Sequence, residues 1–157
     1  MNLLKFHNKI KGYTQNRQPG IEADMEPKPI AELEEYKAAG KLENKVALIT
    51  GGDSGIGRAI AILYAKEGAN VAIGYYDEHQ DAEDTVNRLQ EMGVKAKAYA
   101  HDLKDEKQSQ KLIKDVINDF GSLNILVNNG GVQFPRDHFE DITPQQVKET
   151  FMTNIFG

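Results

Sequence analysis

The segment from Thr50 to Gly57 (TGGDSGIG) contains the residue types of this 157-residue chain that point most directly to chemistry. It lies between an apolar run and a stretch with helical spacing, where backbone N–H groups and the positive end of a helix can meet a pyrophosphate. Gly51 permits a tight turn, Gly55 lets the backbone approach a phosphate, and Gly57 lets the helix pack on the sheet. The lysine of a phosphate-binding P-loop is missing, which disfavours a nucleoside triphosphatase. A glycine-rich turn without a ligand is the alternative.

Three further groups of residues directly follow apolar runs. They are Tyr75 with Tyr76, Asp102 with Leu103, and the segment from Asn128 to Gly131. Open parallel sheets bind ligands beyond the carboxyl ends of their strands, so we expect these groups to share one site with the glycine loop. For Asp102, a solvated carboxylate that caps the following turn is the alternative interpretation.

Apolar runs alternate with amphipathic stretches from Leu42 onward. Strands are predicted at 46–50, 71–75, 95–101 and 123–128. The stretches that follow the first three strands carry apolar residues at helical spacing: Ile56, Ile60, Leu63 and Tyr64, then Val86, Leu89 and Met92, then Leu112, Ile113, Val116, Ile117 and Phe120. This alternation predicts right-handed crossovers and an α/β fold with a doubly wound parallel sheet covered on both faces.

Capping residues mark the starts of two predicted helices. Asp105 with Gln108 three residues later has the spacing of a capping box. Thr143, Pro144 and Gln146 supply a cap, a first-turn proline and a polar residue that can close a second box. The chain is expected to end inside this last helix.

The predicted organisation is an N-terminal arm, residues 1–41, followed by a half-domain, residues 42–157. Residues 13–29 are polar and broken by Pro19, Gly20, Pro27 and Pro29, so an irregular arm is expected. A short helix is predicted at 30–39.

Composition limits the possible functions. The net charge of −5 gives no basic field for nucleic acid, and no apolar run is long enough to span a bilayer. Cysteine is absent from the sequence, which excludes disulfides and thiolate sites and fits a cytoplasmic protein. The four histidines are too dispersed in sequence for metal ligation, so no metal site is expected.

The glycine loop is similar to the TGxxxGxG signature of classical short-chain dehydrogenases/reductases, and Asn128 to Gly131 (NNGG) resembles their NNAG motif. The arm resembles the N-terminal extension of a glucose/ribitol dehydrogenase or aldehyde reductase subgroup. The resemblance covers Leu42 to Gly157, the amino-terminal half of such an enzyme, and implies a truncated Rossmann-like fold. It implies cofactor contacts from Gly51, Asp53, Ser54, Gly55, Ile56, Gly57, Tyr75, Tyr76, Asp102, Leu103, Asn129 and Gly130.

The same resemblance implies the chemistry. The family transfers a hydride between the nicotinamide of NAD or NADP and a small carbonyl or alcohol, with a tyrosine acid/base, a lysine and a serine. Asp102 matches the aspartate that binds the adenine amine. Asn154 matches the asparagine that holds a water linked to the catalytic lysine, and it is the catalytic residue that the chain retains. The serine and the Tyr-x-x-x-Lys pair would follow Gly157, so this chain is predicted to be inactive alone, and the complete enzyme is expected to be a homotetramer.

The cofactor preference leans slightly to NAD. Tyr75 occupies the position of the acidic residue that binds the ribose hydroxyls of NAD, while Ser54 and Tyr76 occupy positions that are often basic in NADP enzymes. Asp53 and Arg58 add opposite charges to the loop. The alternatives to an oxidoreductase are a non-catalytic nucleotide-binding or redox-sensing module and an inactive truncated relic.

Overall fold

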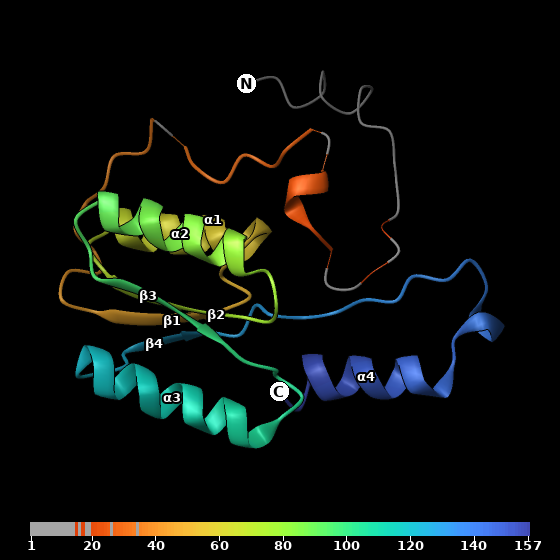
Figure 1. Cartoon of the computed structure of the whole chain (residues 1–157). Coiled ribbons are helices and arrows are strands. Elements are labelled where there is room, and N and C mark those ends of the chain that lie inside the picture. The colour runs from red at the N-terminus through yellow and green to blue at the C-terminus, as the bar shows by residue number, and fades with distance from the viewer. Residues whose placement is uncertain (1–14, 16, 18–19, 26, 34) are drawn as a thin grey trace.

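The computed structural model describes residues 15, 17, 20–25, 27–33 and 35–157. Its strands form one parallel sheet in the order β3-β2-β1-β4, and the helices connect them (Figure 1). The elements are β1 Val46–Thr50, α1 Gly55–Lys66, β2 Asn70–Tyr75, α2 His79–Glu91, β3 Ala96–Ala100, α3 Glu106–Phe120, β4 Ile125–Val127 and α4 Pro144–Asn154. The expected doubly wound α/β architecture is confirmed.

The helices cover both faces of the sheet. Figure 1 shows α1 and α2 on one face and α3 on the other. Because successive side chains of a strand point to opposite faces, Ile49 of β1 packs toward α1 and α2 while Leu48 packs toward Leu112 and Val116 of α3. Both strand residues are fully buried. The core is thus two apolar layers divided by the central strands.

The local sequence signals account for several helix ends. Asp105 caps α3 by accepting hydrogen bonds from the amides of Lys107 and Gln108, and Thr143 forms the expected reciprocal capping box with Gln146 at the start of α4. Gln108 departs from the prediction, because its Oε1 accepts from the Asp102 amide at 3.0 Å rather than closing the box on Asp105.

Helix α1 packs on the sheet through small residues instead of the predicted stripe. Its buried residues are Gly57, Ala61, Ile62 and Ala65, spaced so that the helix can lie close to the strands. Ile56 and Leu63 are 75% and 40% exposed, while Ile60 and Tyr64 flank the core. The predicted apolar face is therefore wrong at Ile56 and Leu63, and the longer side chain that is buried beside the small residues is Ile62.

Three other predictions are corrected. The described residues between 30 and 39 form no helix, and this segment is held on α1 and α2 by side-chain hydrogen bonds and by packing of Ala31 on the core. Ile117 is 44% exposed and lies at the edge of the stripe of α3. Helix α4 ends at Asn154, so the last three residues follow the helix rather than continue it.

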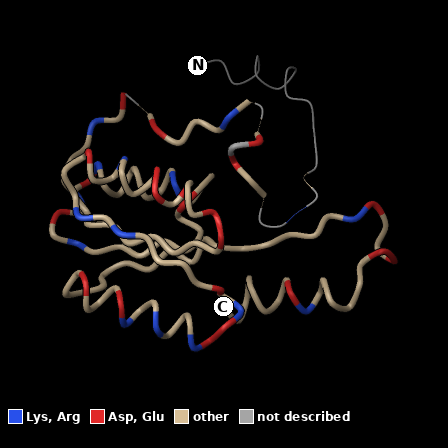
Figure 2. The backbone as a smooth tube through the Cα atoms, viewed as in Figure 1, with Lys and Arg blue, Asp and Glu red and all other residues tan. Residues whose placement is uncertain are grey.

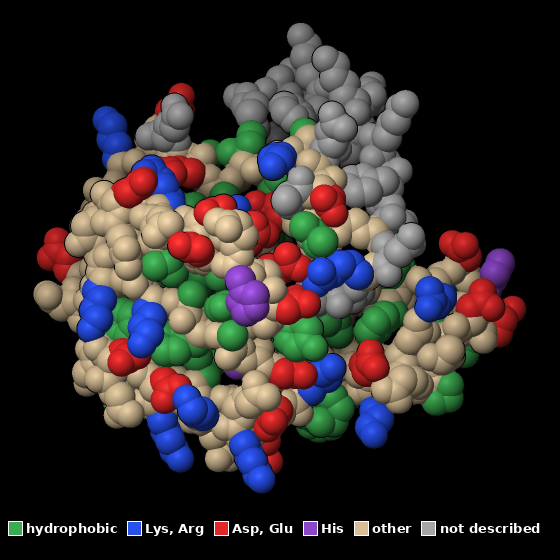
Figure 3. Space-filling model, viewed as in Figure 1, with side chains coloured by type: hydrophobic (Ala, Val, Ile, Leu, Met, Phe, Trp, Pro, Cys, Tyr) green, Lys and Arg blue, Asp and Glu red, His purple; other side chains and the backbone are tan. Residues whose placement is uncertain are grey.

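The surface combines charged helices with some exposed apolar residues. Acidic and basic residues both occur along α3 (Figure 2), and hydrophobic patches lie between charged side chains on the face in Figure 3. On α4, Val147 and Phe151 are 46% and 52% exposed, and none of its residues is buried. Among the described residues, no helix is long and apolar enough to cross a membrane.

Candidate functional site: a cavity at the carboxyl edge of the sheet

The loops after the four strands surround a cavity of about 370 Å³ at the carboxyl edge of the sheet. This volume falls in the range of small-molecule sites. All of the positions predicted to contact a cofactor line the cavity except Gly57: Gly51, Asp53, Ser54, Gly55, Ile56, Tyr75, Tyr76, Asp102, Leu103, Asn129 and Gly130. Segments up to 79 residues apart in sequence therefore meet in one place.

The three glycines of the signature differ in what surrounds them. A Cβ on Gly57 would lie 1.8 Å from Gly51 O, so this position packs the helix against the loop. Gly51 and Gly55 have φ of +61° and +51°, in the left-handed region that favours glycine. A Cβ on Gly55 would meet no described atom within 4 Å, so this side of the loop is open. Gly51 thus has the backbone of a tight turn, Gly55 borders open space, and Gly57 allows close packing of the helix.

The loop presents backbone donors at the start of α1. The first hydrogen bond of the helix runs from the Arg58 amide to Ser54 O at 3.0 Å. The amides of Ile56 and Gly57 precede this ladder and carry the partial positive charge of the helix terminus. An anionic group at this end of the cavity would meet donors that the helix itself does not use.

Asn129 joins the loop after β4 to the glycine loop. Its side-chain Nδ2 donates to Thr50 O at 2.9 Å and to Gly51 O at 3.0 Å. Thr50 Oγ1 in turn accepts from the amides of Asn129 and Gly130, at 3.0 and 2.9 Å. Thr50 begins the predicted glycine loop, but no cofactor contact was expected of it, and its role here is to hold the two loops together. The pair fixes the floor of the cavity.

Gly130 lies where the related motif has alanine. A Cβ there would lie 2.8 Å from Leu103 Cδ1 and 3.3 Å from Thr50 Oγ1. The space of an alanine methyl is therefore taken by the Leu103 side chain, which itself lines the cavity. The glycine accommodates the packing of two neighbouring loops.

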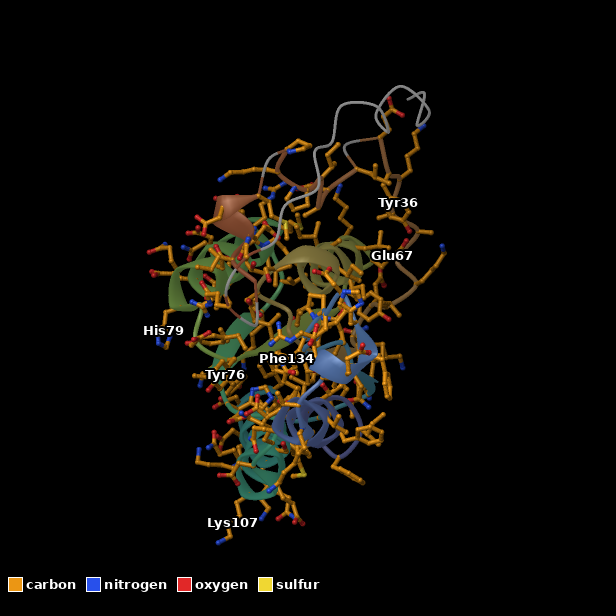
Figure 4. All side chains as sticks on the ribbon, turned by 90° about the vertical axis from the view of Figure 1, so that its right-hand side faces the viewer. Tyr36, Glu67, Tyr76, His79, Lys107 and Phe134 are labelled. Atoms are coloured by element: carbon orange, nitrogen blue, oxygen red, sulfur yellow. The ribbon has the colours of Figure 1, made fainter. Side chains whose placement is uncertain are left out.

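Residues after β2 form another wall. Tyr75 Oη hydrogen-bonds His79 Nδ1 at 2.8 Å, and Tyr76 is half exposed beside the cavity. Figure 4 shows Tyr76 and the cavity-lining Phe134, which come from the loops after β2 and β4. Glu78 also lines the cavity, with its side chain 18% exposed and 2.7 Å from the Arg17 guanidinium. Sequence reasoning missed Glu78 because it lies beyond the end of the strand.

Asp102 makes the turn-capping contacts that were its alternative interpretation. Its Oδ1 accepts from the Lys104 amide at 2.9 Å, and its Oδ2 lies 3.7 Å from Lys104 Nζ. The residue still lines the cavity. Capping the turn and contacting a ligand are compatible here, because a carboxylate has several acceptor positions. The predicted contact with adenine stays a prediction.

His101 is a buried cavity residue that sequence reasoning missed. It is 7% exposed, and within the described part of the chain neither ring nitrogen has a hydrogen-bond partner. Burial lowers the pKa of His101, so the ring favours the neutral form. A Cβ on Gly74 would lie 2.4 Å from the imidazole Cε1, which explains the glycine in β2. The ring thus forms part of the cavity wall, while its two nitrogens are themselves buried.

Asp53 and Asn154 behave differently from simple ligand contacts. Asp53 is 7% exposed, and burial raises the pKa of its carboxyl group. Asn154 ends α4 and pairs with the backbone of Val132, accepting from its N–H at 2.8 Å and donating to its O at 2.9 Å. Thr153 and Glu149 of the same helix line the cavity. The catalytic role of Asn154 stays a prediction, while its visible role is to tie α4 to the loop after β4.

Both a family model and individual known proteins match this chain. The family model of short chain dehydrogenases matches residues 45–157. General stress protein 39 of Bacillus subtilis is 48% identical over 155 residues, which cover 99% of this chain and 54% of that protein. The glucose and ribitol dehydrogenase homolog of Oryza sativa subsp. japonica is 41% identical over 151 residues, covering 91% and 50%. The chain thus spans about half the length of these curated relatives.

Solved structures resemble the described fold. A short chain dehydrogenase from Burkholderia cenocepacia in complex with NADP has a TM-score of 0.71 at 36% identity, covering 74% of this chain and 47% of that one. An NAD+-bound xylitol dehydrogenase has a TM-score of 0.70 at 28% identity, covering 74% and 44%. Among the described residues, no cluster of three His, Cys, Asp or Glu residues could hold a metal ion.

Proposed function

Because the chain belongs to the short chain dehydrogenase family, we propose that its cavity binds NAD or NADP and that the complete protein is an oxidoreductase. The observation that carries the proposal is the open space beside Gly55. It lies next to the amides of Ile56 and Gly57, which precede the first hydrogen bond of α1. A pyrophosphate at this place would accept hydrogen bonds from the backbone and gain from the helix dipole. The His101 ring lines the cavity at the same edge of the sheet.

The charges of the cavity favour NAD over NADP. Among the described lining residues, Asp53, Glu78, Asp102 and Glu149 carry carboxyl groups, against one ammonium from Lys104. The extra phosphate of NADP would bring further negative charge toward this lining, whereas the ribose hydroxyls of NAD can donate to a carboxylate. We assign this role to Glu78 rather than to Tyr75, because the Tyr75 hydroxyl bonds His79. Nearby Arg17 offsets part of the negative charge through its ion pair with Glu78.

We propose that the 157-residue chain binds the cofactor without turnover. When bound, the nicotinamide would supply hydride chemistry toward a small carbonyl or alcohol. The six tyrosines include none that is followed by lysine four residues later, and Asn154 is the only matched residue of the catalytic set. A non-catalytic nucleotide-binding module stays the second candidate. Homotetramer assembly and a cytoplasmic location belong to the proposal for the complete protein.

Calorimetric titration of the purified chain with NAD+ and NADP+ tests the proposal. We expect binding of both, tighter for NAD+, and loss of binding in Gly55→Val, whose side chain would project into the open side of the loop. Gly93→Val is the matched control, since Gly93 has φ of +85° and equally open surroundings in a different loop. Absence of binding by the unmodified chain at millimolar cofactor would contradict the proposal. NADH oxidation with aldehydes or sugars would contradict the inactivity of the chain and exclude the non-catalytic alternative.

A further inference from the structure

We propose that Glu22, in the N-terminal arm, is a positioning residue of the dinucleotide site. Its carboxylate holds the glycine loop by accepting a hydrogen bond from the Gly55 amide and by pairing with Arg58. The inference rests on the proposed function and adds to it a part of the chain that lies outside the strands and helices of the sheet. It makes the arm a component of the cofactor site.

The hydrogen bond from the Gly55 amide to Glu22 takes the place of an N-terminal cap that α1 lacks. Among the described residues, the Ser54 side chain at the N-cap position makes no capping hydrogen bond, and the first turn of α1 contains no acidic residue. A carboxylate at a helix N-terminus satisfies a free amide and interacts favourably with the dipole. Glu22 supplies this group from 33 residues earlier in the chain.

The arm is folded around Glu22 so that its side chain reaches the loop. The 3₁₀ turn Glu22–Asp24 lies near the N-terminal ends of α1 and α2 in Figure 1, and Glu22 is 9% exposed. On its N-terminal side, Gln15 holds the backbone of Ile21 from both sides: Gln15 Oε1 accepts from Ile21 N at 2.6 Å, and Gln15 Nε2 donates to Ile21 O at 2.8 Å. Glu22 is therefore a buried acidic residue in an ordered turn and not a surface side chain.

Arg58 connects the same carboxylate to the other side of Ser54. Its Nη1 lies 2.5 Å from Glu22 Oε1, and its Nε donates to Asp53 O at 2.8 Å. Thr85 of α2, which is 1% exposed, donates to the same Asp53 oxygen at 2.9 Å. Glu22 and Arg58 therefore hold Asp53 and Gly55, the two residues that flank Ser54 in the loop.

The charge of Glu22 is compatible with an anionic ligand beyond the loop. A lone carboxylate near a pyrophosphate would weaken binding by repulsion. Here the guanidinium of Arg58 contacts it directly and offsets part of its charge, and their side chains are 18% and 11% exposed, so solvent screens the pair little. Arg58 also lies 3.6 Å from Asp81 Oδ1 and so shares its charge between two carboxylates. The pair clamps the loop, and the Gly55 side that is free of described atoms stays open for the cofactor.

The arm offers its own control. Glu32 pairs with Lys66 and Arg88 at 3.0 Å each, near the C-terminal ends of α1 and α2 and away from the glycine loop. Removing the Glu32 side chain weakens only the attachment of the arm to α1 and α2. Removing the Glu22 side chain also removes the contact with the glycine loop. Both glutamates pair with an arginine, which keeps the chemistry of the comparison similar.

The test is titration of NAD+ into the unmodified 157-residue chain, Glu22→Ala, Glu22→Gln and Glu32→Ala, with a melting curve of each. Glu22→Ala should raise the Kd by roughly tenfold, as expected for loss of a charge-assisted hydrogen bond that orders the site. Glu22→Gln, which keeps an acceptor, should recover part of the affinity, and Glu32→Ala should stay within about twofold of the unmodified chain. Equal effects of Glu22→Ala and Glu32→Ala, no effect of Glu22→Ala, or tighter binding by it would overturn the proposal.

Hydrogen exchange of the Gly55 amide, followed by NMR, tests the contact without the cofactor and without relying on a variant. Slow exchange in the unmodified, unliganded chain supports the clamp, and exchange at the rate of an unprotected backbone amide overturns it. If the unmodified chain binds neither NAD+ nor NADP+, the proposed function fails by itself. The exchange result then still decides whether Glu22 holds the loop.

Discussion

The backbone amide of Asn129 donates to Thr50 Oγ1 at 3.0 Å, and the side chain of the same residue donates to Thr50 O at 2.9 Å. Thr50 ends β1 and Asn129 follows the neighbouring parallel strand β4, and the two residues are 79 positions apart in the sequence. The pairing continues the sheet by side-chain hydrogen bonds beyond the last backbone ones. It also sets the distance between the two loops that form the cavity floor.

Asn129→Ala should destabilise the chain by about 1–3 kcal/mol, because the carbonyl groups of Thr50 and Gly51 lose a donor in a partly buried place. It should also weaken binding of NAD+, since Gly51 would no longer be fixed. Urea unfolding and calorimetric titration measure the two effects. Asn128→Ala, a change at the exposed neighbouring position, is the control. Equal stabilities for both variants would show that the Asn129 contacts contribute nothing.

Gly55→Ala and Gly57→Ala should separate ligand binding from folding. Gly55→Ala places a methyl group in open space with left-handed backbone, at a cost of about 1–2 kcal/mol, and should abolish dinucleotide binding. Gly57→Ala brings the methyl to within 1.8 Å of Gly51 O and should cost at least about 3 kcal/mol or prevent folding.

The control for this pair is Gly93→Ala, which has the same kind of backbone strain and open surroundings but does not line the cavity. Its melting temperature should fall as far as that of Gly55→Ala while its affinity for NAD+ is unchanged. Retained affinity in Gly55→Ala would argue against a phosphate at this position. A melting temperature of Gly57→Ala equal to that of the unmodified chain would contradict the close packing of α1.

Glu67 should make the stability of the chain sensitive to acid. The hydroxyl of Tyr36 and the amides of Ala39 and Lys41 donate to its carboxylate, and these contacts, with Tyr36 contributing most, lower the pKa of Glu67 to about 2 (Figure 4). The unfolded carboxyl titrates near 4.5, so the stabilisation is complete above that pH and is lost as the pH falls toward 2.

Glu67→Gln tests this dependence through urea unfolding at pH 6, 4.5 and 3. The variant should be less stable than the unmodified chain at pH 6, and the difference should shrink as the pH falls, because only the unmodified chain loses its ionised partner. Glu91→Gln, at a side chain that is 66% exposed, is the control and should show a nearly constant difference. A constant difference for Glu67→Gln would mean that its carboxylate does not stabilise the attachment of residues 36–41 to α1.

His101 should produce a second pH dependence with a different window. Burial lowers its pKa from 6.5, so the folded chain binds a proton less readily than the unfolded chain. Its contribution to stability is therefore complete above pH 6.5 and declines as the pH falls below that value. His101→Asn should lack this decline and should also bind NAD+ severalfold more weakly, because the cavity wall loses the imidazole.

NMR titration of the imidazole resonances and unfolding at pH 5 to 8 measure these effects. His79→Asn is the comparison, since that ring is exposed and bonds Tyr75 outside the core. A His101 resonance that titrates at or above pH 6.5 would contradict a buried neutral ring. Unchanged affinity in His101→Asn would exclude the ring from the ligand site.

The sequence alone determined the order of strands and helices, the position of the glycine loop and most of the residues around the cavity. These features are local: buried parallel strands are continuous apolar runs, and a ligand site at their carboxyl ends follows from the direction of the chain. Thr50 to Gly57 and Asn128 to Gly131 could therefore be placed in one site before any contact between them was known.

Only the tertiary structure decided which neighbours those residues have. Helical spacing could not show that α1 packs through Gly57 and Ala61 rather than Leu63, because this depends on how closely the helix approaches the sheet. Burial of His101 against Gly74, and the reach of Glu22 to Gly55, arise from segments distant in sequence. Such contacts follow from the folded path of the chain, which no local pattern of residue types encodes.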